Sequence, residues 1–224
     1  MNIAPFIDHT LLIPTTTISD VKNLCSEAIE YGFAAVCIPP PLVKNAKGYL
    51  KGTDVKTATV IGFPFGYSNA KAKIFETQQA IEDGADEMDM VINLTALRGN
   101  AWSYLESEVK YIVEAIHKNG KLLKVIIESG ILTNEEIVRC CEIYAKADVD
   151  FVKTSTGYAE KGATLEAVQL MRKTLPSSIR IKASGGIRNY EFAKQLIATG
   201  ADRLGCSASV AIMNEQLNKS NEGL

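Results

Sequence analysis

The sequence lacks the features of a membrane protein, a secreted domain or a nucleic-acid-binding protein. No apolar run approaches the roughly 18 residues that cross a bilayer. The N-terminal stretch MNIAPFIDHTLL has no basic segment followed by an apolar core, so no signal peptide is indicated. Basic residues never form a run longer than two, and the net charge is −2. We therefore expect a soluble cytoplasmic protein without a membrane or nucleic-acid partner.

Cysteine and histidine are also scarce. Five cysteines at irregular spacings argue for reduced thiols rather than a disulfide framework. The two histidines are His9, which is a possible site residue, and His117, which is expected at the surface near a helix end. No group of cysteines and histidines has the spacing of metal ligands. We expect no metal ion and no cofactor.

What the sequence has instead is a repeat of short apolar runs and longer runs of helical period. Helices are expected from Thr17 to Gly32, through residues 105–116, and near residues 69–83, 134–147, 164–175 and 190–199. Strands are expected within residues 8–10, 34–38, 57–63, 87–93, 122–129, 151–156, 179–184 and 203–207. The junctions YGFAAV, DGADEMDM, KADVDFVK and TGADRLG each close a helix and open a strand.

Apolar strands that alternate with helices indicate parallel pairing, because each crossover helix covers a face of the sheet. Counting the weak first unit, the chain has eight strands and eight helices, which predicts a (β/α)8 TIM barrel spanning residues 1–224 as a single catalytic domain. The alternative is an open doubly wound sheet. That fold would place a G-x-G-x-x-G turn after the first strand, and the sequence has none there.

Three of the predicted strands carry a lysine in an apolar setting. The spacing is 29 residues from Lys124 to Lys153 and again from Lys153 to Lys182, which is one repeat period. We therefore expect the three lysines at similar height on consecutive strands. Side chains alternate along a strand, so Asp89 shares one face with Val91 and is expected to point into the same interior.

Crowded lysines in a barrel interior favour amine chemistry. Neighbouring strands lie roughly 4.8 Å apart, so the Lys153 and Lys182 nitrogens are expected within about 6 Å. Repulsion of about 3 kcal/mol, together with burial, would lower the pKa of Lys153 by about two units. A neutral amine can form a Schiff base with a carbonyl substrate, and Asp89 could exchange protons. Lys124 is expected to be structural, paired with Glu128 or Asp89.

Small polar residues follow three of the late strands, at the end of a barrel where active sites form. Ser184 and Ser207 can donate hydroxyl hydrogens, and Arg188 can add positive charge. Glycines allow a close approach of backbone N–H groups to an anion. These loops, at residues 154–157, 184–186 and 205–207, predict a phosphate site.

Eight motifs together resemble the deoxyribose-phosphate aldolase family over nearly the whole chain. They are IDHTLL at 7–12, VCIPP at 36–40, VIGFPFG at 60–66, ADEMDMVIN at 85–93, LLKVIIESG at 122–130, FVKTSTG at 151–157, IKASGGIR at 181–188 and RLGCS at 203–207.

The resemblance implies a class I, metal-independent aldolase that cleaves 2-deoxy-D-ribose 5-phosphate to D-glyceraldehyde 3-phosphate and acetaldehyde. Lys153 matches the Schiff-base lysine, Lys182 the second lysine, and Asp89 the acid that relays protons. The implied substrate-binding positions are Asp8, Thr10, Gly157, Gly185, Gly186 and Ser207. Lys124, Arg188 and Ser184 are expected in support.

The chain departs from the family pattern at four places. Members often have Asn at Pro39, some have Ser at Ala208, and some have a basic residue at Tyr158. Some members end in a tyrosine that reaches the site, whereas this sequence ends in NEGL.

Two other functions stay open on the sequence alone. One is another Schiff-base barrel lyase, such as a transaldolase or a keto-acid aldolase; a site that binds a carboxylate would need an arginine at a strand end, and Arg188 is the candidate. A catalytically silent phosphosugar-binding barrel would use the lysines only as a structural network. The partner expected is a small phosphosugar, together with a homo-oligomer, most simply a dimer.

Overall fold

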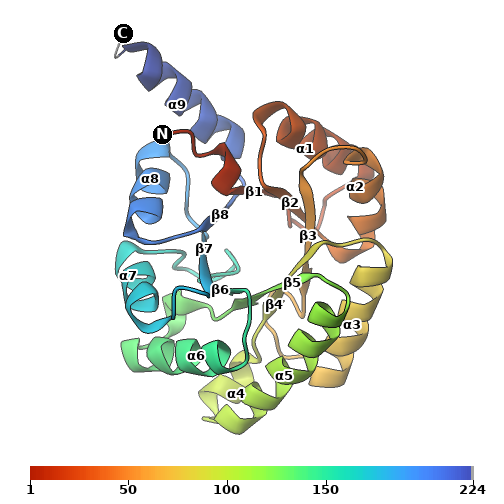
Figure 1. Cartoon of the computed structure of the whole chain (residues 1–224), viewed down its shortest axis with the longest axis vertical. Helices are drawn as coiled ribbons and strands as arrows, with labels where there is room; N and C mark the ends of the chain where they lie inside the picture. The colour runs from red at the N-terminus through yellow and green to blue at the C-terminus, as the bar shows by residue number, and fades with distance from the viewer. Residues whose placement is uncertain (223–224) are drawn as a thin grey trace.

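A computed structural model describes residues 1–222 of the chain. Eight parallel strands form a closed barrel in the order β1 to β8, and helices surround it (Figure 1). The predicted (β/α)8 barrel is confirmed. The open-sheet alternative is wrong, because β1 pairs with β8 through Asp8 and Gly205 and leaves no free edge.

The strands lie where the apolar runs predicted them, but several are shorter. They are β1 (Ile7–Thr10), β2 (Ala35–Ile38), β3 (Lys56–Ile61), β4 (Glu87–Val91), β5 (Leu122–Ile126), β6 (Phe151–Lys153), β7 (Arg180–Ser184) and β8 (Arg203–Cys206). Strand β6 ends at Lys153, and the polar residues after it already belong to the loop at the barrel mouth. Shortening the strand in this way places Lys153 at the last strand position.

All six helices predicted by range are present. They are α1 (Ile18–Tyr31), α3 (Ala70–Glu82), α5 (Trp102–Lys118), α6 (Asn134–Lys146), α7 (Leu165–Thr174) and α8 (Tyr190–Thr199). Helix α1 illustrates why the boundaries could be read. Thr17 and Asp20 form a reciprocal capping box at its start, and Gly32 ends it with a left-handed backbone at φ +69°.

Three α-helices of the described residues have no individual counterpart among the predicted ranges. They are α2 (Val43–Tyr49), α4 (Leu94–Arg98) and α9 (Ser209–Glu222). The structure also has three short 3-10 turns, η1 (Ala4–Phe6), η2 (Pro40–Leu42) and η3 (Ser129–Ile131). Helices α2 and α4 are too short for a periodic signal. Within residues 1–222, no helix combines the length and apolar character that a bilayer span requires. The NEGL ending, where some family members have a tyrosine, includes residues 223–224, which lie outside the described part.

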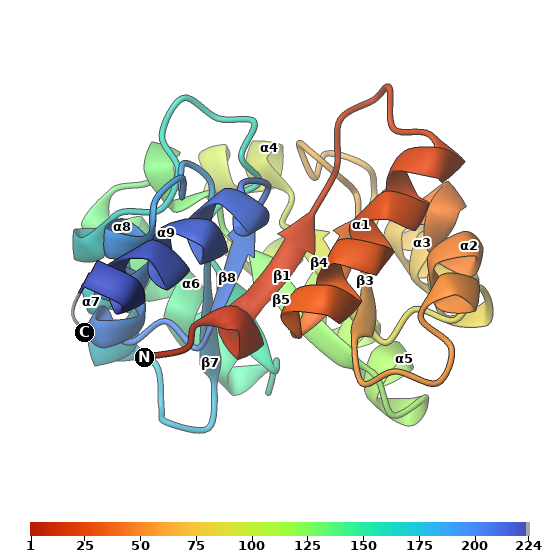
Figure 2. The ribbon, with the colours of Figure 1, turned by 90° about the horizontal axis from the view of Figure 1, so that it is seen from above.

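The buried residues form two layers. The larger layer lies between the strands and the surrounding helices. The smaller one lies inside the barrel and consists of Ala35, Cys37, Ala58 and Val60 on β2 and β3. The other strands place mainly charged side chains in the interior, beside the buried Phe151 ring of β6. Figure 2 shows β1 pointing toward the end of the barrel where the connecting loops rise, which is the end of the predicted site.

The loop between β3 and α3 provides a test of this packing. Gly66 has φ +67°, and a Cβ there would lie 1.8 Å from the Ile92 carbonyl oxygen. Gly32 has nearly the same φ but open space around it. We expect Gly32→Ala to lower the unfolding free energy by about 1 kcal/mol, which is the cost of a left-handed backbone at alanine. Gly66→Ala should carry the same backbone cost and, in addition, about 3 kcal/mol for the steric overlap with Ile92. Chemical denaturation of both variants checks this, and equal losses would contradict the close approach.

Candidate active site

Seven charged side chains meet inside the barrel and form what we call the interior charge cluster. Its members are Asp8, Glu87, Asp89, Lys124, Lys153, Lys182 and Arg203, supplied by β1, β4, β5, β6, β7 and β8. Asp8, Asp89, Lys124 and Lys182 have no solvent exposure. Buried charges are tolerated only when each one is paired and hydrogen-bonded.

Asp89 is the centre of the cluster. Its Oδ2 atom accepts from Lys153 Nζ at 2.8 Å and from Lys182 Nζ at 2.7 Å. Its Oδ1 atom accepts from Lys124 Nζ at 2.7 Å. Two nitrogens that touch one oxygen cannot be farther apart than the sum of the two contacts. The expected proximity of Lys153 and Lys182 is therefore confirmed.

Six members of the cluster form a closed ring of alternating charge. Lys124 contacts Glu87 at 2.6 Å as well as Asp89, and Lys182 contacts Asp8 as well as Asp89. The ring closes at Arg203, which lies 2.6 Å from Asp8 and 3.4 Å from Glu87. We call the cycle Arg203–Asp8–Lys182–Asp89–Lys124–Glu87 the charge ring. Lys153 is the seventh member, attached to the ring through Asp89.

The heights of the three lysines differ from the prediction. Lys153 and Lys182 are register partners across β6 and β7, as expected. Lys124 is instead the partner of Phe151, two residues below Lys153, because the strands of a barrel are staggered. Its expected pairing with Asp89 is confirmed, whereas the alternative with Glu128 is wrong. The Glu128 carboxylate accepts hydrogen bonds from Thr156.

Lys153 is the cluster member whose charge is least supported. Burial lowers its pKa, the Asp89 carboxylate raises it, and the neighbouring Lys182 ammonium lowers it, with a net result below the ordinary value. The direction agrees with the prediction, but burial is a larger cause than repulsion. Lys153 is therefore the side chain in this interior most disposed to hold a neutral amine.

The charge ring holds its own members ionised. Although burial acts against the ammonium form, Asp8 and Asp89 raise the pKa of Lys182 above its ordinary value. Asp89 and Glu87 do the same for the pKa of Lys124. Burial would raise the pKa of Asp89, yet three lysines hold it well below its usual range. The two lysines of the ring thus stay cationic because each contacts more than one carboxylate, whereas Lys153 contacts Asp89 alone.

Glu87 and Arg203 were not predicted as site residues. The sequence contains a signal for each of them. Glu87 shares strand parity with Asp89, and Arg203 is the first residue of the RLGCS motif. The position of Arg203 next to Asp8 depends on closure of the barrel between β8 and β1. That contact joins the two ends of the chain and has no local signal in the sequence.

A cavity of about 470 Å³ opens above the cluster at the C-terminal ends of the strands. Lys153 lies at its base, and the loops after β6, β7 and β8 converge on it as predicted. Eight of the predicted residues line it: Thr10, Lys153, Gly157, Ser184, Gly185, Gly186, Arg188 and Ser207. Gly157, Gly185 and Gly186 all adopt positive φ, which turns these loops tightly around the cavity.

Two of the predicted binding residues differ from expectation. Asp8 does not line the cavity, because it is fully buried below it and bound to Lys182 and Arg203. Ser184 lines the cavity, but its hydroxyl donates to the Ser155 carbonyl oxygen at 2.6 Å. Its hydrogen is therefore already engaged, and toward a ligand the Ser184 oxygen is an acceptor.

Tyr158, noted only as a departure from the family, forms part of the cavity wall. Its hydroxyl donates to the Leu12 carbonyl oxygen at 2.9 Å, and its ring meets Phe63 edge-on at 5.4 Å between centroids. Tyr158 thereby joins the loops after β1, β3 and β6 across the mouth. This role could not be read from the sequence, since the three loops are far apart along the chain.

Neither histidine reaches the cavity. His9 is buried and points away from the barrel interior, with Nε2 2.7 Å from Glu27 of α1 and Nδ1 3.0 Å from Ser209 of α9. His117, near the end of α5, lies 3.0 Å from Asp150, as its expected surface position allows. His9 is therefore a structural link between β1 and two helices.

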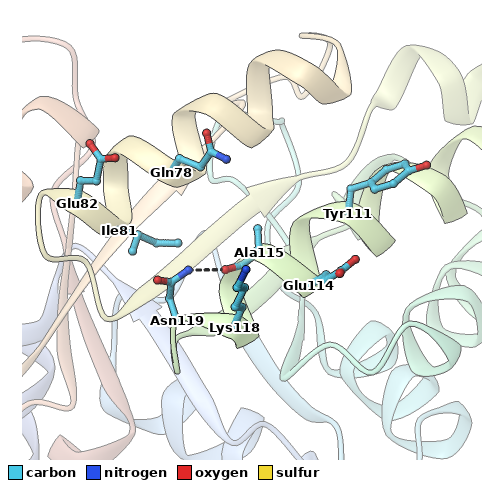
Figure 3. A pocket seen from close by; sticks show the side chains of 8 residues that line it. All are labelled: Gln78, Ile81, Glu82, Tyr111, Glu114, Ala115, Lys118 and Asn119. Carbon is cyan, nitrogen blue, oxygen red and sulfur yellow. Dashed lines mark hydrogen bonds between the residues drawn. The ribbon is translucent and has the colours of Figure 1, made fainter.

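A second hollow of about 500 Å³ lies on the outside of the barrel between α3 and α5. Figure 3 shows that its walls carry mixed charges and an exposed tyrosine, Tyr111. It contains neither a buried titratable group nor any member of the interior charge cluster. The cavity at the barrel mouth is therefore the candidate active site.

The structure is a closed parallel barrel with a buried lysine at its mouth, and comparison with known proteins identifies it as a barrel of the aldolase class. Residues 3–208 match the DeoC/LacD family aldolases. The chain belongs to this family.

Relatives named deoxyribose-phosphate aldolase support the assignment. The Thermococcus gammatolerans protein is 49% identical over 97% of this chain and 98% of its own length. The Caldicellulosiruptor saccharolyticus protein is 51% identical over 95% of this chain and 97% of its own. The solved tetrameric deoxyribose phosphate aldolase of Aeropyrum pernix is 34% identical, with a TM-score of 0.89 over 95% of this chain and 89% of that one.

The charge ring predicts a large stability difference between two lysine variants. Lys124→Met would leave Glu87 and Asp89 buried with one fewer cation, so we expect a loss of about 3–5 kcal/mol in unfolding free energy. Lys121→Met removes a partly exposed lysine 3.3 Å from Asp86 and should cost less than about 1 kcal/mol. Urea denaturation compares the two, and similar costs would argue against a tightly coupled ring.

Proposed function

We propose that this aldolase cleaves 2-deoxy-D-ribose 5-phosphate to D-glyceraldehyde 3-phosphate and acetaldehyde through a Schiff base on Lys153, without a metal ion. The observation that carries the proposal is the position of Lys153, a buried lysine that lines the cavity while its Nζ atom shares Asp89 Oδ2 with the Lys182 ammonium. The direction of its pKa, below the ordinary value, agrees with this role. The names of the relatives support the substrate.

In the first step the neutral Lys153 amine attacks C1 of the open-chain sugar, and loss of water gives an iminium ion. In the second, the C3 hydroxyl loses its proton and the bond between C2 and C3 breaks. The electron pair of that bond moves toward the iminium nitrogen and forms a neutral enamine, while C3 leaves as the aldehyde of glyceraldehyde 3-phosphate. Protonation at C2 and hydrolysis then release acetaldehyde and restore the amine.

Lys182 and Asp89 are proposed to handle the protons. Asp89 Oδ2 touches both lysine nitrogens, so a proton can pass between them without leaving the cluster. Because the pKa of Asp89 is held well below its usual range, its carboxylate acts mainly as a fixed anion and proton conduit. Lys182, held cationic by Asp8 and Asp89, is the proton store.

The phosphate is proposed to bind at the glycine-lined side of the cavity. Gly157, Gly185 and Gly186 offer backbone N–H groups that no side chain shields, and Ser207 and Arg188 line the same wall. Thr10 is proposed to face the sugar from the opposite side. Asp8, which lies below the cavity, acts only through Lys182.

The other candidate activities lack a comparable observation. A keto-acid substrate would need an arginine beside Lys153, and Arg188 lies on the phosphate wall proposed here. A silent sugar-binding barrel has no use for a lysine with a lowered pKa at its cavity. Assembly as a homo-oligomer, most simply a dimer, stays a prediction, and the Aeropyrum pernix relative is described as tetrameric.

The covalent step can be tested by trapping. We expect acetaldehyde followed by borohydride to leave an ethyl group on Lys153, located by peptide mass spectrometry, because reduction fixes the imine. Lys153→Ala should abolish the adduct, whereas Lys161→Ala, in the same loop but exposed, should retain it. Absence of a Lys153 adduct in the unaltered protein would exclude the Schiff-base mechanism.

The pH dependence tests the role of Lys182. Removing its positive charge in Lys182→Leu should raise the pKa of Lys153, so the acid limb of the pH–rate profile should move up by about one to two units. Turnover at neutral pH should fall with it. Lys182→Arg keeps the charge and should leave the acid limb in place. If both variants gave the unaltered profile, repulsion would have no part in lowering the pKa.

A further inference from the structure

We propose that Arg203, at the end of the barrel opposite the cavity, is a positioning residue that keeps the Lys153 amine unprotonated by closing the charge ring. The inference rests on the proposed function, since it concerns the charge state of the proposed Schiff-base lysine. Arg203 opens β8, whereas the cavity lies at the other ends of the strands. It therefore acts on the chemistry only through other residues.

The contacts of Arg203 define what it does. Its Nη1 atom lies 2.6 Å from Asp8 Oδ1 and 3.4 Å from Glu87 Oε2, and so joins these two carboxylates. Lys124 is the other cation near both, with its Nζ atom 2.6 Å from Glu87 Oε2 and 3.8 Å from Asp8 Oδ2. Its side chain is 13% exposed, on the N-terminal side of the barrel. With Arg203 in place, three carboxylates alternate with three cations, and the ring is neutral.

Lys153 is not one of the three cations that neutralise the carboxylates of the charge ring. Lys182 and Arg203 each contact two carboxylates and Lys124 contacts three, whereas Lys153 contacts Asp89 alone. A proton on Lys153 therefore adds a positive charge to an already neutral and buried set. That is the position from which a proton is most easily lost.

The charge balance around Lys153 involves groups from several strands. Among the described residues, those that act on Lys153 directly are Cys37 of β2, Asp89 of β4, Lys182 of β7 and, after β5, Glu128. Asp8 of β1, Glu87 of β4, Lys124 of β5 and Arg203 of β8 are connected to it through Asp89 and Lys182, and Arg188 and Tyr158 line the cavity above it. Strand β3 contributes apolar Ala58 and Val60. Glu128 stands apart, because its carboxylate is engaged by Thr156 and burial raises its pKa.

Removing Arg203 should return the proton to Lys153. Without it, three carboxylates would face two cations in the opened ring, and the Lys153 ammonium would restore neutrality. Arg203 and Lys153 are two strands apart, or roughly 10 Å. The loss of one positive charge at that distance should raise the midpoint of the Lys153 titration by about one pH unit. Glu87→Gln removes an anion from the ring and should shift the midpoint in the opposite direction.

The experiment follows the pH dependence of acetaldehyde trapping at Lys153 in the full-length protein. We expect Arg203→Met to raise the midpoint by about one unit, which is about a tenfold loss of trapping rate on the acid side. Arg203→Lys should keep the unaltered midpoint, because the charge is retained. Arg180→Met is the matched control: Arg203 and Arg180 both pack on the Phe151 ring, at 5.6 and 4.0 Å from its centroid, but Arg180 does not belong to the charge ring.

The outcomes separate this inference from the proposed function. If Arg203→Met and Arg180→Met share the unaltered midpoint, Arg203 only supports the fold and the inference is overturned. If Arg203→Met does not fold, Glu87→Gln decides: a lowered midpoint supports the charge balance, and an unchanged one overturns it. If the unaltered protein gives no Lys153 adduct at any pH, the proposed function itself is wrong.

Discussion

The structure depends on the pairing of three carboxylates with three cations in a closed cycle inside the barrel. An eight-stranded barrel is normally filled by branched apolar side chains. Here the apolar filling is small: Ala35, Cys37, Ala58 and Val60 of β2 and β3 form one group, and the Phe151 ring of β6 packs against Lys124 and Arg203. Charges in the remaining space would each cost several kcal/mol alone, and the alternating contacts offset most of that cost. The stability of the fold must come mainly from the apolar layer between strands and helices.

The same arrangement explains how one side chain can differ from its neighbours. Lys153 and Lys182 are register partners and touch the same oxygen of Asp89, yet their pKa values are displaced in opposite directions. The difference comes from Asp8, which contacts Lys182 and not Lys153. A pair of lysines thereby becomes an amine and an ammonium, which is the separation that an acid–base mechanism requires.

Much of the fold and of the active site could be predicted from the sequence, because strand parity, repeat period and loop composition are local features. Strand parity and the repeat period identified Lys153, Lys182 and Asp89, and the carboxyl ends of parallel strands explain why three glycine-containing loops converge. What could not be predicted depends on barrel closure and stagger. The contact of Arg203 with Asp8 joins β8 to β1, and the lower position of Lys124 follows from the strand offset.

The charge balance also bears on the intermediates of the proposed reaction. An iminium ion on Lys153 restores the surplus positive charge that the neutral amine had removed, in a site where Asp89 is already shared by three lysines. Cleavage of the bond between C2 and C3 turns that iminium into a neutral enamine and relieves the surplus. The interior therefore favours the amine and the enamine over the cation between them. Since only interactions that change along the reaction alter its rate, this preference assists the bond-breaking step itself.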